Sequence, residues 1–85
     1  MIVRLKAEAP ERNVARFYTL RTSTNLWGEV VVSSSYGRIG THDNVKHRYF
    51  ADNSQANTYI TTVLRKRLNA TSRIGCNYQI VRFSS

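Results

Sequence analysis

The chain has 85 residues, of which 41% are hydrophobic, and nine of them are aromatic. This length allows one modest hydrophobic core and leaves no room for a large catalytic cleft. No long apolar run is present, so we expect no membrane span, and the charges near Met1 argue against a signal peptide. The lone Cys76 cannot form an intramolecular disulfide and favours a reducing, cytoplasmic setting.

The charge is strongly unbalanced: thirteen basic residues against five acidic ones give a net charge of +8. Ten of the thirteen are arginine, whose planar fork of donors matches phosphate oxygens. Such a surplus on a small domain is typical of nucleic-acid-binding proteins. Charge alone leaves acidic protein partners and anionic lipid open as alternatives.

The first two predicted elements are strands joined by a turn. Residues 2–8 alternate between apolar and charged side chains, which indicates a strand. Pro10 lies in the polar segment 9–13 and predicts a turn there. Residues 14–22 are rich in β-forming side chains, and strand geometry would place Phe17 and Tyr18 on opposite faces.

Two more strands follow. Residues 23–25 predict a turn, and residues 27–35 a third strand in which Gly28 is a candidate bulge. Residues 45–50 alternate again as a fourth strand, with Lys46 and Arg48 on one face. These two cations would lie about 7 Å apart, close to the spacing of successive phosphates along a nucleic-acid strand.

The period then changes to that of a helix. Asp52 and Gln55 have the spacing of a capping box, ahead of an apolar stripe. The stripe consists of Ala56, Ile60, Val63 and Leu64. Residues 76–83 alternate as a last strand. The order predicts an α+β fold: an antiparallel β-sheet of about four to five strands with one helix packed across it.

Basic residues end the predicted helix. Arg65, Lys66 and Arg67 suit the negative end of the helix dipole, and they are most simply interpreted as solvated charges. If the helix end shares a face with Lys46 and Arg48, the five cations form a track for phosphates.

The sequence shows no evident metal-binding or catalytic motif. His42, Asp43, His47 and Cys76 lack the close spacing of a metal site, and we expect no metal, cofactor, small-molecule substrate or enzymatic activity. Residues 37–40 match the Gly-x-x-Gly loop of KH domains, but that loop joins two helices, whereas strands flank it here.

The segment Tyr36-Gly37-Arg38-Ile39-Gly40-Thr41, placed after a strand, resembles the Trp-Gly-Arg motif of the WGR domain family, usually continued as Ile-Gly or Val-Gly. Residues 16–20 and 27–30 are similar to the strands before that motif, and tyrosine here takes the place of the tryptophan. Further matching positions are Phe50, Ala56, Leu64, Lys66 and Tyr78. The resemblance implies one WGR-like domain over residues 1–85.

The WGR family occurs in poly(ADP-ribose) polymerases, where it helps to recognise DNA ends, and in bacterial proteins, some of them single domains. The resemblance implies that the ring of Tyr36 contacts DNA. It makes Arg38 the motif arginine, which in the polymerases also serves contacts between domains. The structural alternatives are that Tyr36 is a core or edge aromatic and that Arg38 braces the turn by bonding backbone carbonyls.

The sequence thus predicts a small non-catalytic module that binds DNA through the phosphate backbone or strand ends, with little sequence specificity. RNA in place of DNA, and the oligomeric state, are left open. One alternative is a protein–protein adaptor that uses the same basic surface beside a DNA-processing protein. Another is an accessory product that retains no DNA affinity. The candidate nucleic-acid-binding residues are Tyr36, Gly37, Arg38, Lys46, Arg48, Arg65 and Lys66.

Overall fold

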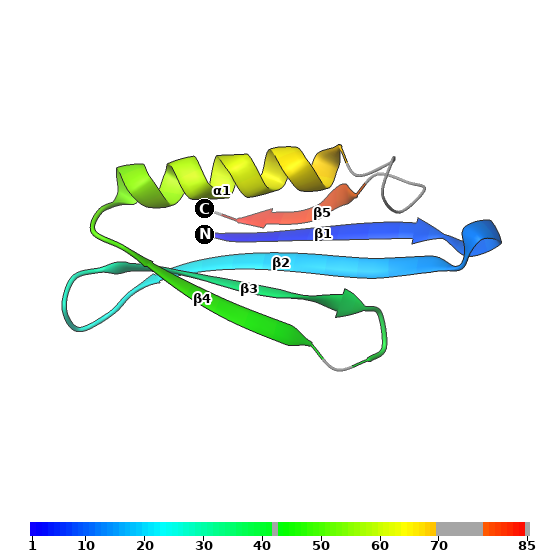
Figure 1. The fold of residues 1–85 in the computed structure, drawn as a ribbon, viewed down its shortest axis with the longest axis horizontal. Helices are drawn as coiled ribbons and strands as arrows, with labels where there is room; N and C mark the ends of the chain where they lie inside the picture. Colours follow the sequence, from blue (N-terminus) through cyan, green and yellow to red (C-terminus); the bar gives the residue numbers. More distant parts are fainter. Residues whose placement is uncertain (42, 70–77, 85) are drawn as a thin grey trace.

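The computed structural model describes residues 1–41, 43–69 and 78–84. In these residues an antiparallel sheet of five strands, in the order β4-β3-β2-β1-β5, carries one α-helix (Figure 1). The elements are β1 (Ile2–Ala9), η1 (Pro10–Arg12), β2 (Val14–Thr24), β3 (Val30–Arg38), β4 (Asn44–Phe50), α1 (Asn53–Leu68) and β5 (Gln79–Ser84). The α+β prediction is therefore confirmed.

The connection between β1 and β2 is the turn that Pro10 predicts. Pro10 begins the 3-10 helix η1, where its missing N–H costs nothing. Asn13 closes the turn with φ 55°, a left-handed conformation that asparagine tolerates, and its N–H donates to the carbonyl of Pro10. The two strands then pair from Ala9 and Val14 to Ile2 and Arg21.

The hydrophobic core lies between α1 and one face of the sheet. The register places Leu5 beside Tyr18 and Val3 beside Leu20, so these side chains share a face. The core comprises Val3, Leu5, Ala7, Tyr18, Leu20, Val30, Val32, Ala56, Ile60 and Tyr78. Phe17 points to the opposite face and is also buried, which confirms the predicted split between Phe17 and Tyr18.

Helix α1 begins as its capping signal predicts. Asp52 has extended backbone angles, and its Oδ1 accepts a hydrogen bond from the N–H of Gln55 at 2.9 Å. Ala56 and Ile60 are buried, and Val63 and Leu64 are half-buried. The helix contains several threonines and asparagines with weak helix propensity, so its stability depends on this packing.

The third strand was predicted three residues too early. Residues 25–29 form a turn in which the Oδ1 of Asn25 accepts from the N–H groups of Trp27 and Glu29, both at 3.0 Å. Gly28 lies in this turn with φ 79° and is not a bulge. The Asn25 side chain thus ends β2, and Trp27 is left 81% exposed at the tip.

The same strand continues further than the pattern predicts. Tyr36, Gly37 and Arg38 are the last residues of β3 and pair with β2, so the motif lies on a strand rather than in a turn. The turn follows it, where the N–H and hydroxyl of Thr41 both donate to the carbonyl of Arg38.

The last strand is an edge strand with an irregularity. Ile80 pairs with Leu5 and Arg82 with Arg4, so Val81 is an extra residue and the predicted alternation is broken at that point. Cys76, placed in this strand by the sequence, lies outside the described residues. In the described part of the chain, no helix has the length and apolarity needed to cross a membrane.

Candidate nucleic-acid interface

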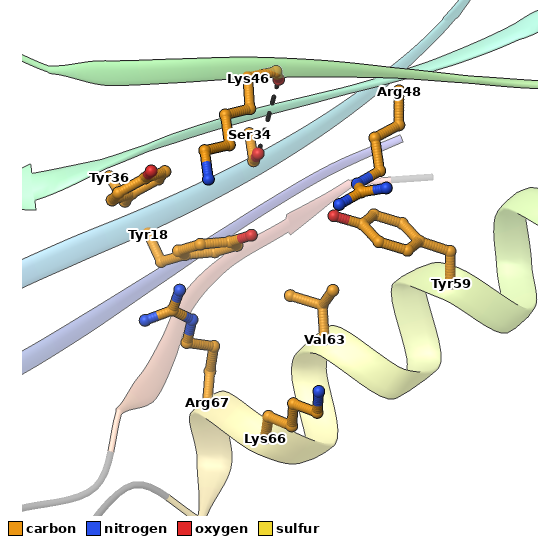
Figure 2. A pocket seen from close by; sticks show the side chains of 9 residues that line it. All are labelled: Tyr18, Ser34, Tyr36, Lys46, Arg48, Tyr59, Val63, Lys66 and Arg67. Atoms are coloured by element: carbon orange, nitrogen blue, oxygen red, sulfur yellow. Dashed lines mark hydrogen bonds between the residues drawn. The ribbon is translucent and has the colours of Figure 1, made fainter. Parts of the chain in front are cut away.

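A cavity of about 320 Å³ lies between α1 and strands β3 and β4 (Figure 2). The register brings Lys46 beside Ser34 and Tyr36 beside Tyr18, so side chains from three strands turn toward the helix. Along its successive turns, α1 contributes Tyr59, Val63 and then the cations Lys66 and Arg67. The cavity is lined by Tyr18, Ser34, Tyr36, Lys46, Arg48, Tyr59, Val63, Lys66 and Arg67.

The lining is strongly electropositive. Of the nine described residues that line it, four are cations and none is a carboxylate. Lys66 and Arg67 come from the last turn of α1, and Lys46 and Arg48 come from β4 across the cavity. Within the described residues, none of the four forms an ion pair with a carboxylate. The cavity therefore concentrates positive potential where an anion can approach.

A stack of rings and one guanidinium ties the end of α1 to the sheet. The rings of Tyr18 and Tyr36 are stacked, with centroids 5.8 Å apart and planes at 19°. The Cζ of Arg67 lies 4.2 Å from the centroid of Tyr18, and 5.9 Å from those of Tyr36 and Tyr78. Such cation–π contacts are worth about 0.5–2 kcal/mol. Tyr36 is thus a packed, half-buried ring.

The two cations of β4 also rest on rings. The Nζ of Lys46 lies 5.9 Å from the centroid of Tyr36, and the Cζ of Arg48 lies 5.2 Å from that of Tyr59. Figure 2 shows both side chains pointing from β4 toward the cavity. The contact with a ring face restricts each side chain but does not use its N–H donors in a hydrogen bond, so donors remain available to a ligand.

A second cavity of about 320 Å³ continues the first toward the motif. It shares Tyr36 and Arg67 with the first, so the two form one surface, which we call the basic groove. Its lining is Arg16, Tyr36, Gly37, Arg38, Asn44, Arg67 and Tyr78. Among the described residues, the basic groove as a whole presents six cations and no carboxylate.

The motif arginine has a structural partner. Arg38 donates to the carbonyl oxygen of Asn13 at 3.1 Å and to its Oδ1 at 2.8 Å. The guanidinium thereby braces the left-handed residue between η1 and β2. The structural alternative places such bonds in the turn beside the motif, and only one of the two acceptors is a backbone carbonyl. A guanidinium has five N–H donors, so others are left to face the groove.

Six of the seven candidate residues line the basic groove. They are Tyr36, Gly37, Arg38, Lys46, Arg48 and Lys66. Arg65 does not: it lies with Thr58, Thr61 and Thr62 on the outer side of α1. Neighbouring helix positions differ by about 100° in direction, which separates Arg65 from Lys66.

Sequence reasoning left several groove residues out of the candidate set. Arg67 belongs to the conditional phosphate track but not to the candidate set, although it follows Val63 by four residues and so continues the sheet-facing stripe. Tyr18, Tyr59 and Arg16 carry no local signal, since only the packing of α1 and the pairing of β2 with β3 bring them to the groove.

Comparison with known proteins agrees with the motif. The family model described as WGR domain matches residues 1–73. A protein of Sinorhizobium fredii described as "Uncharacterized protein y4dW" is 31% identical over 58 residues, which are 68% of this chain and 28% of that protein. The chain thus spans little more than a quarter of that relative's length. No solved structure matches. Because the family match covers most of the residues, motif included, the chain belongs to the WGR domain family.

Proposed function

We propose that this WGR domain binds DNA without catalysis, by holding the phosphate backbone in the basic groove. WGR domains are small non-catalytic modules often associated with nucleic-acid binding. The observation that carries the proposal is the collection of six cations in one groove whose described lining residues include no carboxylate. These cations are Arg16, Arg38, Lys46, Arg48, Lys66 and Arg67.

The positions of the cations suit a phosphate track. Lys46 and Arg48 project from the same face of β4, about 7 Å apart by strand geometry. Lys66 and Arg67 approach from the opposite wall, so a backbone lying along the groove meets donors on both sides. Tyr36 between them offers a flat ring with a polar tip, which suits packing against a sugar.

Little sequence preference is expected from such contacts. Phosphate and sugar contacts fix position and orientation, while reading a sequence requires side chains that reach the base edges. The helix in this domain lies with its apolar side against the sheet, and its last turn contributes cations to the groove wall. Recognition of the backbone, internal or at an end, is therefore the mode we propose.

We further propose that residues 1–85 act as one domain. The family match ends at residue 73, yet β5 pairs with β1 along Ile2–Lys6 and extends the same sheet. Tyr78, just before β5, belongs to the same hydrophobic core as Ala56 and Ile60 of the helix. A C-terminal segment whose strand extends the sheet and whose Tyr78 lies in the core supports one cooperative unit.

The decisive experiment compares two arginines of this domain: Arg48, which lines the groove, and Arg65, which lies outside it. Binding of wild type, Arg48→Gln and Arg65→Gln to a labelled blunt duplex is measured by fluorescence polarisation over a salt series. Each variant loses one positive charge, so net charge is matched. We expect Arg48→Gln to lower the slope of log K against log salt by about 0.9 and Arg65→Gln to leave it unchanged.

Two outcomes would contradict the proposal. Equal slopes for both variants would mean that net charge alone attracts the duplex. Duplex affinity that does not fall as salt rises would exclude the electrostatic mechanism, and the protein-adaptor alternative would take its place. Far-UV circular dichroism and urea unfolding of each variant establish that the fold is retained.

A further inference from the structure

The face of the sheet opposite α1 carries a second set of cations. The register places Arg4 and Lys6 of β1, Arg21 of β2 and Arg82 of β5 on this face. No helix in the described residues covers it, because the core and α1 occupy the other face. We call this surface, together with the β3 and β4 side chains beside it, the open face.

The cations of the open face repel one another. Arg4 and Arg82 are direct cross-strand partners, and like charges in that position destabilise a sheet. Among the described strand residues of this face Glu8 is the single acid, and it lies at the far end of β1, paired with Ala15. In the part of the chain described here, no ion pair offsets the repulsion. A bound anion would relieve it.

One of these arginines is already held in place. The Cζ of Arg4 lies 5.4 Å from the centroid of Phe17, which is only 6% exposed although no described helix covers this face. Phe17 is the cross-strand partner of Gly37, which has no side chain beside the ring. A guanidinium lying over a ring keeps the N–H donors at its edge free for phosphate oxygens.

The other half of the open face has a different chemistry. Strands β3 and β4 present Ser33, Ser35, His47 and Tyr49 there, and the Oγ of Ser33 lies 2.9 Å from the Nδ1 of His47. Tyr49 is 59% exposed. Between the two halves lies Thr19, whose buried hydroxyl has no hydrogen-bond partner. The face thus sets cations beside hydroxyl groups and an accessible ring.

We propose that the open face binds single-stranded nucleic acid. The cations of β1, β2 and β5 would hold phosphates, and Tyr49 would stack a base. The strand spacing puts β2 and β4 about 10 Å apart, so one nucleotide chain can reach both. A duplex keeps its bases paired and could use only the cations, whereas a single strand uses the ring as well. The inference does not depend on DNA binding in the basic groove, which lies on the opposite face of the sheet.

The test exchanges two charges on each face. Arg21→Gln/Arg82→Gln alters exposed cations of the open face, and Lys46→Gln/Arg48→Gln removes the same charge from the groove. The probes are labelled oligothymidylate, oligouridylate and a blunt duplex. We expect the open-face pair to weaken oligothymidylate binding about fivefold or more and to lower its salt slope by about 1.4. The groove pair should leave single-strand affinity within about twofold.

A third variant tests stacking apart from charge. Tyr49→Ala keeps the net charge and alters an exposed side chain, so the fold should be unaffected. We expect it to weaken single-strand binding about tenfold and to leave duplex binding unchanged. Urea unfolding of all three variants shows whether an effect arises from the site or from the fold. A difference between the two single-stranded probes would show whether RNA or DNA is the better ligand.

Several results would overturn the proposal. If both charge pairs weaken oligothymidylate binding equally, the strand is bound in the groove or by net charge. If polyglutamate competes for the open face and Tyr49→Ala has no effect, the surface suits an acidic protein segment instead. Failure of the groove proposal looks different, because then Lys46→Gln/Arg48→Gln leaves duplex binding unchanged whatever happens on the open face.

Discussion

Both faces of this sheet carry cations, but the cations have different surroundings on the two faces. On the helix side, Arg67 lies 4.2 Å from the ring of Tyr18 inside walls made by α1, β3 and β4. On the open face, Arg4 lies over Phe17 with no described helix beside it. Phe17 and Tyr18 are consecutive residues and both are nearly fully buried. A long cationic side chain can therefore cover a ring that a second layer would otherwise bury.

The largest expected effect separates these two rings. Tyr18→Ala removes a ring from the main core and its stack with Tyr36, and we expect it to lower the free energy of unfolding by about 3 kcal/mol or more. Phe17→Ala should cost less, because its cavity opens toward water and the side chains above it can collapse. Urea unfolding followed by circular dichroism measures both. Equal losses would mean that the open face is packed as firmly as the core.

A smaller effect is expected for the two guanidinium groups. Arg67→Ala should lower the free energy of unfolding by about 1–2 kcal/mol, since Arg67 contacts three tyrosines. Arg4→Ala should cost about 0.5–1 kcal/mol, because Arg4 contacts one ring at a longer distance. Thermal and urea unfolding give both values. In the control Arg67→Lys, the charge is kept and the flat group is lost, so a result like that of wild type would argue against a ring-specific contact.

The smallest effect concerns the motif arginine. Arg38→Gln should remove both hydrogen bonds to Asn13 and lower the free energy of unfolding by no more than about 1 kcal/mol, because the pair is exposed. We expect the loss of duplex-binding free energy in this variant to exceed its loss of unfolding free energy. Asn13→Gly is the matched control, since it keeps the left-handed backbone and removes only the Oδ1 acceptor. A loss of affinity in Asn13→Gly equal to that in Arg38→Gln would assign Arg38 a purely positioning role.

Much of the fold could be predicted because its signals are local. Alternation over residues 2–8, 14–22 and 45–50 reports which side chains share a sheet face, and the Asp52–Gln55 pair marks where α1 begins. The bounds of β3 were less predictable. The side-chain bonds of Asn25 delay its start, and pairing with β2 carries it through the motif. A valine-rich segment indicates a strand, but it does not indicate at which residue the strand begins or ends.

The family motif, the strand and helix periods and the large positive charge can all be seen in the sequence alone. Which charges lie beside one another depends on the tertiary structure. Arg65 and Lys66 are neighbours in the chain, yet one faces outward and the other lines the groove with Lys46. Likewise Arg82 meets Arg4 only because β5 returns to pair with β1. Local patterns fix the direction of a side chain on its own element, whereas its neighbours depend on how distant elements pair and pack.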